Sequence, residues 1–346
     1  MRVLQIINCF GLEYGGSSEV CYQISKALML RGHTVKIVSP IKGTLPEGSE
    51  KFYLNQLPSK EYEIVHMHNY RNYSNILGWS YSIHYNIPYL LQAHGSIGTF
   101  FSKGFRKRIF DLVIGKQILR GEYRGIAISK DEYNQYLNMG VKENKVRLLF
   151  NAIDLSQFKE MPKRGLFRDK YSIPQTAKLV LYLGRIHWIK GLDLLIESFS
   201  KLPTDTYLAI VGQDDGYLKT VESLIDRYNI RDRVRLTGGL FGKNKLEAFI
   251  DADVNVLFSS YEVFSVGVLE ACACGCPVVV SNNCGNVEWL DGAVYPVRRN
   301  VYDIVNTTNK VLYNKDVSAS LSHKAVNIIK EFTWNKVAEK LELIYK

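Results

Sequence analysis

The feature that most constrains the fold of this chain is a regular alternation of short apolar runs with helical patterns. In the first half, strand-like runs occupy residues 2–7, 34–38, 63–66, 88–93, 125–128 and 146–149. The second half repeats the pattern, with runs near 178–183, 206–211, 234–237, 254–258, 277–280 and 293–296. Amphipathic helical patterns separate successive runs. Strands joined through helices form parallel sheets, so the sequence predicts an α/β protein with two doubly wound parallel sheets.

A polar stretch from Lys159 to Tyr171 separates the two series of strands. With 346 residues, the chain fits two domains of ordinary size. We therefore expect an N-terminal Rossmann-like domain over residues 1–160 and a C-terminal one over residues 161–332, facing each other across a cleft.

The composition is that of a globular protein, with 46% apolar and 23% charged residues. No run of 18 or more apolar residues occurs, so no membrane-spanning helix is expected. The chain enters a strand at once, without the features of a secretory signal. Its six cysteines are accordingly expected to be reduced thiols, and the location that we predict is the cytoplasm.

The net charge of +10 is concentrated in one segment, residues 99–124, which carries seven basic residues against two acidic ones. Aromatic and aliphatic residues lie between these charges. A basic, aromatic-rich amphipathic segment is attracted to anionic membranes, so the inner face of the cell membrane is a candidate partner. The alternative is a surface helix with its apolar side on the core. Nucleic acid is not expected, because no motif of a nucleic-acid-binding fold accompanies the charge.

Glu262 and Glu270 follow a predicted buried strand, the first in a loop and the second one helix later. Open α/β sheets bind ligands at the carboxyl ends of their strands. Carboxylates at that edge accept hydrogen bonds from hydroxyl groups, which ribose and hexoses carry in number. The pair indicates a sugar site; the alternative is one loop glutamate and one solvated helix glutamate.

Arg185 and Lys190 lie five residues apart in a loop that leads from a strand into a helix. Two cations beside a helix N-terminus suit a diphosphate. Gly15 and Gly16 form another strand-to-helix turn that lets backbone amides approach a phosphate. NAD is not expected, because G-x-G-x-x-G is absent and no acidic residue follows the second strand.

Three histidines follow predicted strands. His66 and His68 lie on one face of a strand end, which suits either half a metal site or a packing role. His94, just past the next strand, is placed to hydrogen-bond a ligand hydroxyl.

Two further motifs contain metal-binding residue types. The cysteines of residues 272–276 lack the paired spacing of a zinc site. The Asp-Ala-Asp sequence of residues 251–253 resembles a D-x-D metal pair, but Asp253 begins a buried strand. We therefore expect no metal.

Together these motifs resemble the GT-B glycosyltransferases of the retaining family 4 type, also called glycosyl transferases group 1, over nearly the whole chain. They are Gly15-Gly16, Gly32-His33, His66-Met67-His68, His94-Gly95, Asn151 to Asp154, Gly184-Arg185, Lys190-Gly191, Val211-Gly212, Glu262 through Glu270, Gly275 and Pro277. The resemblance implies a hexosyltransferase that needs no metal or cofactor and takes a UDP- or GDP-sugar as donor. The acceptor is then a glycan, glycolipid or polyprenyl-linked glycan in cell-envelope polysaccharide or glycoconjugate synthesis. The final helix, residues 333–346, is expected to pack back on the N-terminal domain.

The resemblance also implies a role for each motif residue. Arg185 and Lys190 would bind the diphosphate, Glu270 the ribose and Glu262 the transferred sugar. His94 would contact that sugar from the N-terminal domain. The remaining binding residues are Gly15, Gly16, Gly184, Gly212, Phe264, Ser265 and Val266. The backbone amides near Phe264 and Ser265 would assist Glu262 in holding the sugar. Ser265 is a departure, because relatives often carry glycine there; it crowds the sugar or adds a hydroxyl contact.

Other functions could use the same motifs. A nucleotide-sugar epimerase of this fold needs acid–base carboxylates that the N-terminal half does not offer as a set. A phosphorylase needs pyridoxal phosphate on a lysine and usually a much longer chain. A non-catalytic sugar-nucleotide-binding protein does not require two cations on a diphosphate. Release of nucleoside diphosphate only when an acceptor is added distinguishes the transferase from all three.

Overall fold

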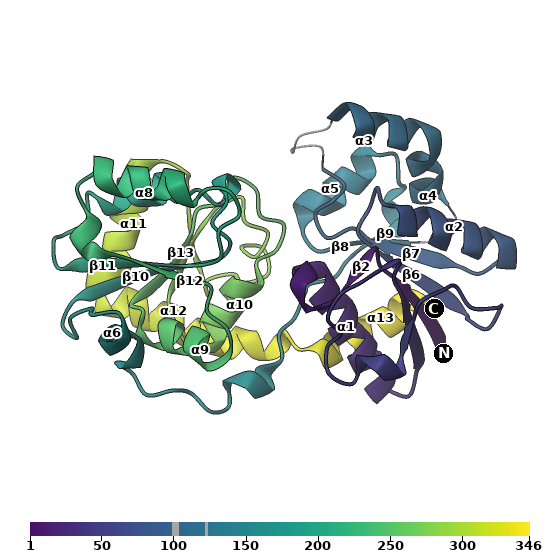
Figure 1. Ribbon diagram of the computed structural model, residues 1–346, viewed down its shortest axis with the longest axis horizontal. Coiled ribbons are helices and arrows are strands. Elements are labelled where there is room, and N and C mark those ends of the chain that lie inside the picture. The colour runs from purple at the N-terminus through teal and green to yellow at the C-terminus, as the bar shows by residue number, and fades with distance from the viewer. Residues whose placement is uncertain (99–103, 122–123) are drawn as a thin grey trace. The chain divides into compact units, whose positions relative to one another are not determined.

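The computed structural model describes residues 1–98, 104–121 and 124–346, and the chain divides into two compact units (Figure 1). Unit 1 comprises Met1–Ala152 and Thr333–Lys346, and unit 2 comprises Ile153–Phe332. Residues 153–160, which we expected in the first domain, therefore fall in unit 2. The buried Ile153 provides the reason, because its N–H donates to the Phe332 carbonyl at 3.1 Å and ties this segment to the end of unit 2.

Unit 1 is built on a seven-stranded parallel sheet with the order β5-β3-β1-β6-β7-β8-β9. The strands are β1 (Arg2–Ile6), β3 (Thr34–Val38), β5 (Tyr53–Leu54), β6 (Ile64–His68), β7 (Tyr89–Gln92), β8 (Arg124–Ala127) and β9 (Val146–Leu148). A separate short pair joins β2 (Cys9–Phe10) and β4 (Ile41–Lys42). The helices are α1 (Gly16–Leu30), α2 (Tyr73–Tyr85), α3 (Gly104–Phe110), a π-helical turn (Asp111–Gly115), α4 (Lys116–Arg120), α5 (Lys130–Asn138) and α13 (Trp334–Tyr345).

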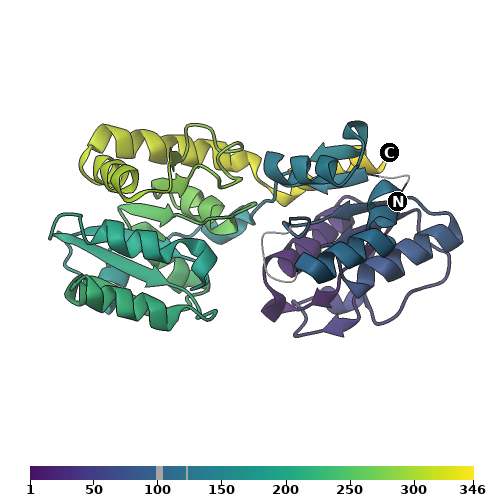
Figure 2. The same cartoon turned by 90° about the horizontal axis from the view of Figure 1, so that it is seen from above.

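Unit 2 contains a six-stranded parallel sheet with the order β12-β11-β10-β13-β14-β15. The strands are β10 (Lys178–Leu183), β11 (Thr206–Val211), β12 (Val234–Gly238), β13 (Val254–Leu257), β14 (Val278–Ser281) and β15 (Tyr295–Val297). The helices are α6 (Leu166–Lys170), α7 (Leu192–Phe199), α8 (Leu218–Arg227), α9 (Gly242–Asp251), α10 (Val266–Ala273), α11 (Val301–Tyr313) and α12 (Lys315–Ile328). Figure 2 shows helices on both faces of each sheet. The prediction of two doubly wound parallel sheets is thus confirmed.

The central strands of both sheets are buried on both faces, which explains their continuous apolar sequences. In unit 2, all three valines of the run at 278–280 are fully buried. In unit 1, one core cluster extends from Leu4 on β1 to Tyr136 on α5. Because the strands are parallel, their carboxyl ends collect at one edge of each sheet, where the predicted site residues lie.

The C-terminal helix α13 packs against α1 inside unit 1. The Arg31 guanidinium binds the Glu342 carboxylate in a bidentate manner, at 2.7 and 3.0 Å. His33 lies 2.9 Å from the same carboxylate, so this residue has a structural role in the packing of α13 against the end of α1. Tyr345, near the end of the chain, lies against the sheet with its hydroxyl 2.9 Å from Nδ1 of His66.

Of the basic segment 99–124, residues 99–103 and 122–123 lie outside the described part of the chain. The rest is mostly helical, as expected, and forms α3, the π-helical turn and α4. No helix among the described residues is both long enough and apolar enough to span a membrane.

Candidate functional site

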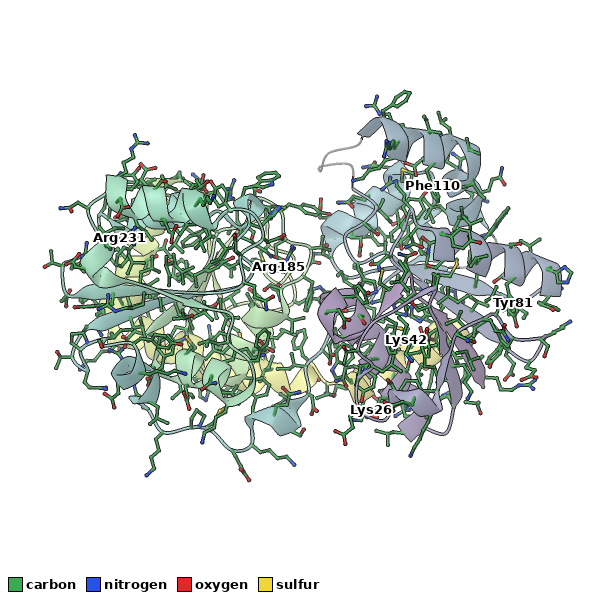
Figure 3. All side chains as sticks on the ribbon, viewed as in Figure 1. Lys26, Lys42, Tyr81, Phe110, Arg185 and Arg231 are labelled. Atoms are coloured by element: carbon green, nitrogen blue, oxygen red, sulfur yellow. The ribbon has the colours of Figure 1, made fainter. Side chains whose placement is uncertain are left out.

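The predicted site residues of unit 2 gather where the loops after β10 and β13 meet. These strands are central neighbours, and the chain leaves them toward opposite edges of the sheet, so the loops diverge at a switch point that suits ligand binding. The loops also touch. The Ser260 N–H donates to the Ile189 carbonyl at 2.8 Å, and a Cβ on Gly191 would lie 2.1 Å from the Phe258 carbonyl oxygen. Figure 3 places Arg185 and Arg231 at opposite ends of this sheet.

Lys190 and Glu262, predicted from separate motifs, form an ion pair with Nζ 2.5 Å from Oε2. Their side chains are only 16% and 13% exposed, so water screens the pair weakly. The Ser259 hydroxyl lies 3.4 Å from the same carboxylate oxygen, and the Glu262 carbonyl accepts from the Gly285 N–H at 2.8 Å. The arrangement holds a cation and an acceptor for hydroxyl groups side by side.

Glu270 takes part in a second pair of this kind, which sequence reasoning missed. Its carboxylate lies 2.6 Å from Nζ of Lys245 on α9, and both side chains are largely buried. Nothing in the sequence around Lys245 indicates this partner, because the two residues lie on different helices 25 positions apart.

Arg185 is solvent-exposed and pairs with Asp215 in the loop after β11. The backbone beneath it is fixed, because the Tyr182 hydroxyl donates to the Arg185 carbonyl at 2.7 Å. Gly212 lies so close that a Cβ there would be 1.8 Å from the Gly184 carbonyl oxygen. Glycine at 212 is therefore required by the approach of the two loops.

The loop before α10 differs from our expectation at Ser265. We expected the backbone amides near Phe264 and Ser265 to reach the sugar. The Ser265 N–H instead donates to Oδ1 of the buried Asn286 at 2.6 Å, and the Asn286 amide donates back to the Ser265 carbonyl at 3.0 Å. Asn286 thus fixes the start of α10, and Ser265 would meet a ligand through its hydroxyl.

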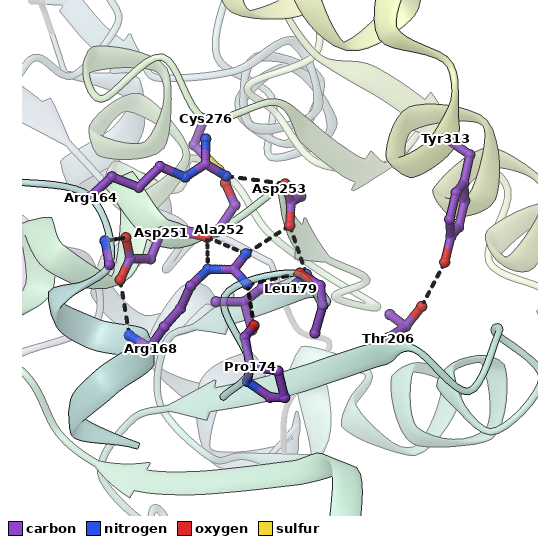
Figure 4. Close-up of polar contacts among 12 residues, drawn as sticks. Arg164, Arg168, Pro174, Leu179, Thr206, Asp251, Ala252, Asp253, Cys276 and Tyr313 are labelled. Atoms are coloured by element: carbon purple, nitrogen blue, oxygen red, sulfur yellow. Dashed lines mark hydrogen bonds and ion pairs between the residues drawn. The ribbon is translucent and has the colours of Figure 1, made fainter. Parts of the chain in front are cut away.

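Asp251 and Asp253, the D-x-D sequence, accept hydrogen bonds from the buried Arg168 (Figure 4). Asp251 accepts from the Arg168 N–H at 2.9 Å, and Oδ2 of Asp253 accepts from the Arg168 guanidinium at 2.9 Å. These carboxylates have a structural role. Within residues 1–98, 104–121 and 124–346, no three His, Cys, Asp or Glu side chains are grouped as metal ligands.

The residues predicted in unit 1 lie at the corresponding edge of its own sheet. Gly15 has φ +73°, which suits glycine, and immediately precedes α1. A Cβ on Gly15 or Gly16 would meet no described atom within 4 Å, so their backbone is open to a ligand.

His94 lies in a strained turn, with positive φ both there (52°) and at Gly95 (81°). A buried carboxylate that sequence reasoning missed supports this turn. Glu132 accepts from the Gly95 N–H at 2.5 Å and from the Ile128 N–H at 2.9 Å. Burial raises the pKa of Glu132 to about 7. Because the side chain is fully buried, it supports the backbone and does not face a ligand.

His94 ends a chain of hydrogen bonds through the sheet edge. Gln5 Oε1 lies 2.6 Å from Nε2 of His68, and Nδ1 of His68 lies 2.9 Å from Nε2 of His94. If the Gln5 oxygen accepts, neutral His68 accepts in turn from His94, which leaves an acceptor lone pair on Nδ1 of His94. His66 stacks on His68 with ring centroids 4.5 Å apart, so the His66 and His68 side chains have the packing role.

The three histidines predict a loss of stability of unit 1 in acid. Burial lowers the pKa of His66 and His94 to about 3, and that of His68 well below its ordinary value. The unfolded chain takes up these protons near pH 6.5 and the folded chain does not. The stabilisation is therefore complete above pH 6.5 and is lost as the pH falls toward 3.

One net proton gives a slope of about 1.4 kcal/mol per pH unit. Glu132 acts in the opposite sense, because its raised pKa favours the folded state at low pH. Since three histidines outnumber one carboxyl, we expect the free energy of unfolding of unit 1 to fall by at least about 1.4 kcal/mol from pH 6 to pH 5. Hydrogen exchange of the β1 and β6 amides at the two pH values measures it; equal protection at both would contradict the assignment.

Comparison with known proteins shows which protein family the unit that carries these loops resembles. Residues 163–328 match the family described as Glycosyl transferases group 1. The chain is thus similar to the group 1 glycosyltransferases over most of unit 2. It is 25% identical over 311 residues to an uncharacterized glycosyltransferase of Methanocaldococcus jannaschii, covering 83% of this chain and 75% of that protein. It is 24% identical over 378 residues to one component of the Homo sapiens phosphatidylinositol N-acetylglucosaminyltransferase, covering 99% of this chain and 75% of that protein.

The fold of this chain is also found among solved structures. Anabaena HepE, crystallised in complex with UDP and glucose, matches with a TM-score of 0.82 and 17% identity, covering 99% of this chain and 98% of that one. At this identity the similarity shows a common fold, and that fold is GT-B, as the motifs predicted.

Proposed function

We propose that this chain is a glycosyltransferase that transfers a hexose from a UDP- or GDP-sugar to a glycan, glycolipid or polyprenyl-linked acceptor in glycoconjugate or cell-envelope polysaccharide synthesis. The proposal rests on the two ion pairs, Lys190–Glu262 and Lys245–Glu270, at the carboxyl edge of the unit 2 sheet. A nucleoside diphosphate sugar offers hydroxyls for the two carboxylates and a diphosphate for Lys190. The UDP and glucose named for the Anabaena structure support this donor class.

The arrangement suits a reaction in which the leaving diphosphate gains negative charge. Fixed cations stabilise that charge most in the transition state, and Lys190 and Arg185 are the cations that we assign to it. This role needs no metal ion.

We propose retention by a front-side route, in which the leaving phosphate helps to deprotonate the acceptor. No Asp or Glu occurs between Gln92 and Phe110, and Glu132, which supports the Gly95 backbone, is fully buried. A double displacement would require an accessible carboxylate there as nucleophile. A trapped covalent sugar–enzyme adduct would disprove the front-side route.

A membrane surface is the environment that we propose for the acceptor. On α3 and the π-helical turn, Phe105 and Leu112 are 77% and 72% exposed, and Ile109 and Val113 are also exposed. These positions repeat at helical spacing, and exposed basic residues flank them. An apolar stripe bordered by cations suits an anionic lipid surface. The acceptor of the human relative, by its name, is phosphatidylinositol.

Glu270→Ala tests the donor site. UDP or GDP at about 100 times its dissociation constant is expected to stabilise the wild-type chain by about 2.7 kcal/mol, measured as a thermal shift. Losing the carboxylate should weaken binding by about tenfold to a hundredfold, since hydrogen bonds to charged groups contribute about 1.5–3 kcal/mol.

The matched control is Glu197→Ala, which removes a carboxylate that pairs with Lys201 at 3.5 Å on the exposed surface of the same unit. Its thermal shift should equal that of the wild type. If no nucleotide stabilises the wild type, the donor site is wrongly assigned.

A further inference from the structure

A pocket of about 500 Å³ lies in unit 1 between the turn after β7 and α3. None of its lining residues is assigned to the donor site. Tyr70 and Phe110 provide aromatic walls, Gly95 and Ser96 provide backbone, and Arg106 and Lys107 provide cations. Among the described residues that line it, none is acidic.

Arg71, which also lines this pocket, holds the neighbouring backbone and the Asp111 carboxylate in place. Its φ of 63° is strained, and its guanidinium is held by four hydrogen bonds. Nε and Nη2 donate to the two Asp111 carboxylate oxygens at 2.9 and 2.8 Å, and Nη1 donates to the Ser96 and Ile97 carbonyls at 2.7 and 2.8 Å. The Tyr70 hydroxyl also donates to Asp111, at 2.9 Å.

This network leaves the pocket electropositive. Asp111, the carboxylate beneath it, is neutralised by Arg71 and is buried. The positive charges of Arg106 and Lys107 therefore dominate the lining. Burial and the neighbouring Arg71 lower the pKa of Lys107, so an anion at this point would favour the lysine's charged form.

The pocket borders an apolar face. α3 carries the pocket residues Arg106 and Lys107, and it also carries the exposed Phe105 and Ile109. A phosphate in the pocket would thus lie beside a surface that suits an alkyl or prenyl chain. A sugar phosphate without such a chain would leave that surface unused.

We propose that this pocket binds the phosphate or diphosphate of an amphiphilic acceptor whose apolar chain lies along the exposed face of α3 and the π-helical turn. The inference deepens the proposed function, because it names the acceptor class. The phosphate would contact Arg106 and Lys107, with Arg71 holding the Ser96 and Ile97 backbone in place.

Binding of farnesyl diphosphate to the full chain, measured by calorimetry with saturating UDP to occupy the donor site, tests the inference. Arg106→Gln with Lys107→Gln should weaken binding at least tenfold, because charge-assisted hydrogen bonds are lost. The control, Lys116→Gln with Arg120→Gln, removes two charges from α4 but none from the pocket, and should change binding less than threefold. Lys107→Arg should retain most of the affinity, since it keeps the charge.

Two chemical probes separate the parts of the proposal. Farnesol lacks the anion and inorganic pyrophosphate lacks the chain, so both should bind at least tenfold more weakly than farnesyl diphosphate. If pyrophosphate binds as tightly as farnesyl diphosphate, the ligand of the pocket is not an amphiphile. If the pocket variant and the control variant lose affinity equally, this pocket is not the binding site. Neither result contradicts the assignment of the donor site, because Glu270→Ala tests that site separately.

Discussion

Replacing Lys190 by glutamine is expected to lower the turnover number by about 10²–10³, the usual cost of removing one group that stabilises transition-state charge. The ammonium of Lys190 is fixed 2.5 Å from Glu262 and is largely shielded from water. A positive charge in such a setting acts strongly on the charge that develops on a leaving diphosphate. Glutamine keeps much of the length and polarity but removes the charge, so donor binding should weaken less than turnover.

Lys201→Gln is the matched control for this variant. Lys201 belongs to the same unit, but it pairs with Glu197 at 3.5 Å on the exposed surface. Its loss should leave turnover within about twofold, because Lys201 is not a donor-site residue. Exposed ion pairs contribute only about 0–1 kcal/mol to stability, so the fold should be kept as well. Steady-state kinetics of both variants decide the matter. A Lys190→Gln enzyme with raised KM and unchanged turnover would show that Lys190 binds the ground state and the transition state equally.

The fold was largely predictable because each strand has a local signature. The bounds expected for residues 178–183 and 206–211 coincide with β10 and β11. Central parallel strands are continuous apolar runs, and polar loops bound them. The two-residue strands β2, β4 and β5 have no such run, and their pairing depends on neighbours distant in sequence.

The candidate site was predictable only where its residues belong to sequence motifs. Lys190 and Glu262 were identified separately, but their contact depends on the adjacency of β10 and β13. Lys245, Glu132 and Asn286 were missed, because each acts on a residue at least 21 positions away on another element. The sequence around Ser265 did not show that its backbone N–H would donate to Asn286.

Replacing Arg168 by leucine is expected to lower the free energy of unfolding by about 3–5 kcal/mol, the cost of breaking a buried ion pair from one side. Its side chain is 2% exposed. The guanidinium donates to the carbonyls of Asp251, Pro174 and Ala177 and to the Asp253 carboxylate (Figure 4). Leucine satisfies none of these acceptors, and each then stays buried without that donor.

Arg164→Leu is the informative comparison, because Arg164 binds the other oxygen of the Asp253 carboxylate, at 3.2 Å, with 61% of its side chain exposed. Water replaces this cation readily, so the loss should be below about 1 kcal/mol. Urea unfolding of both variants gives the difference, with hydrogen exchange of the β10 amides to assign it to unit 2. If both variants lose equally little free energy of unfolding, the Arg168 network is not needed to position Asp251 and Asp253. A large loss for Arg168→Leu alone would show that burial, and not charge pairing as such, makes these aspartates structural.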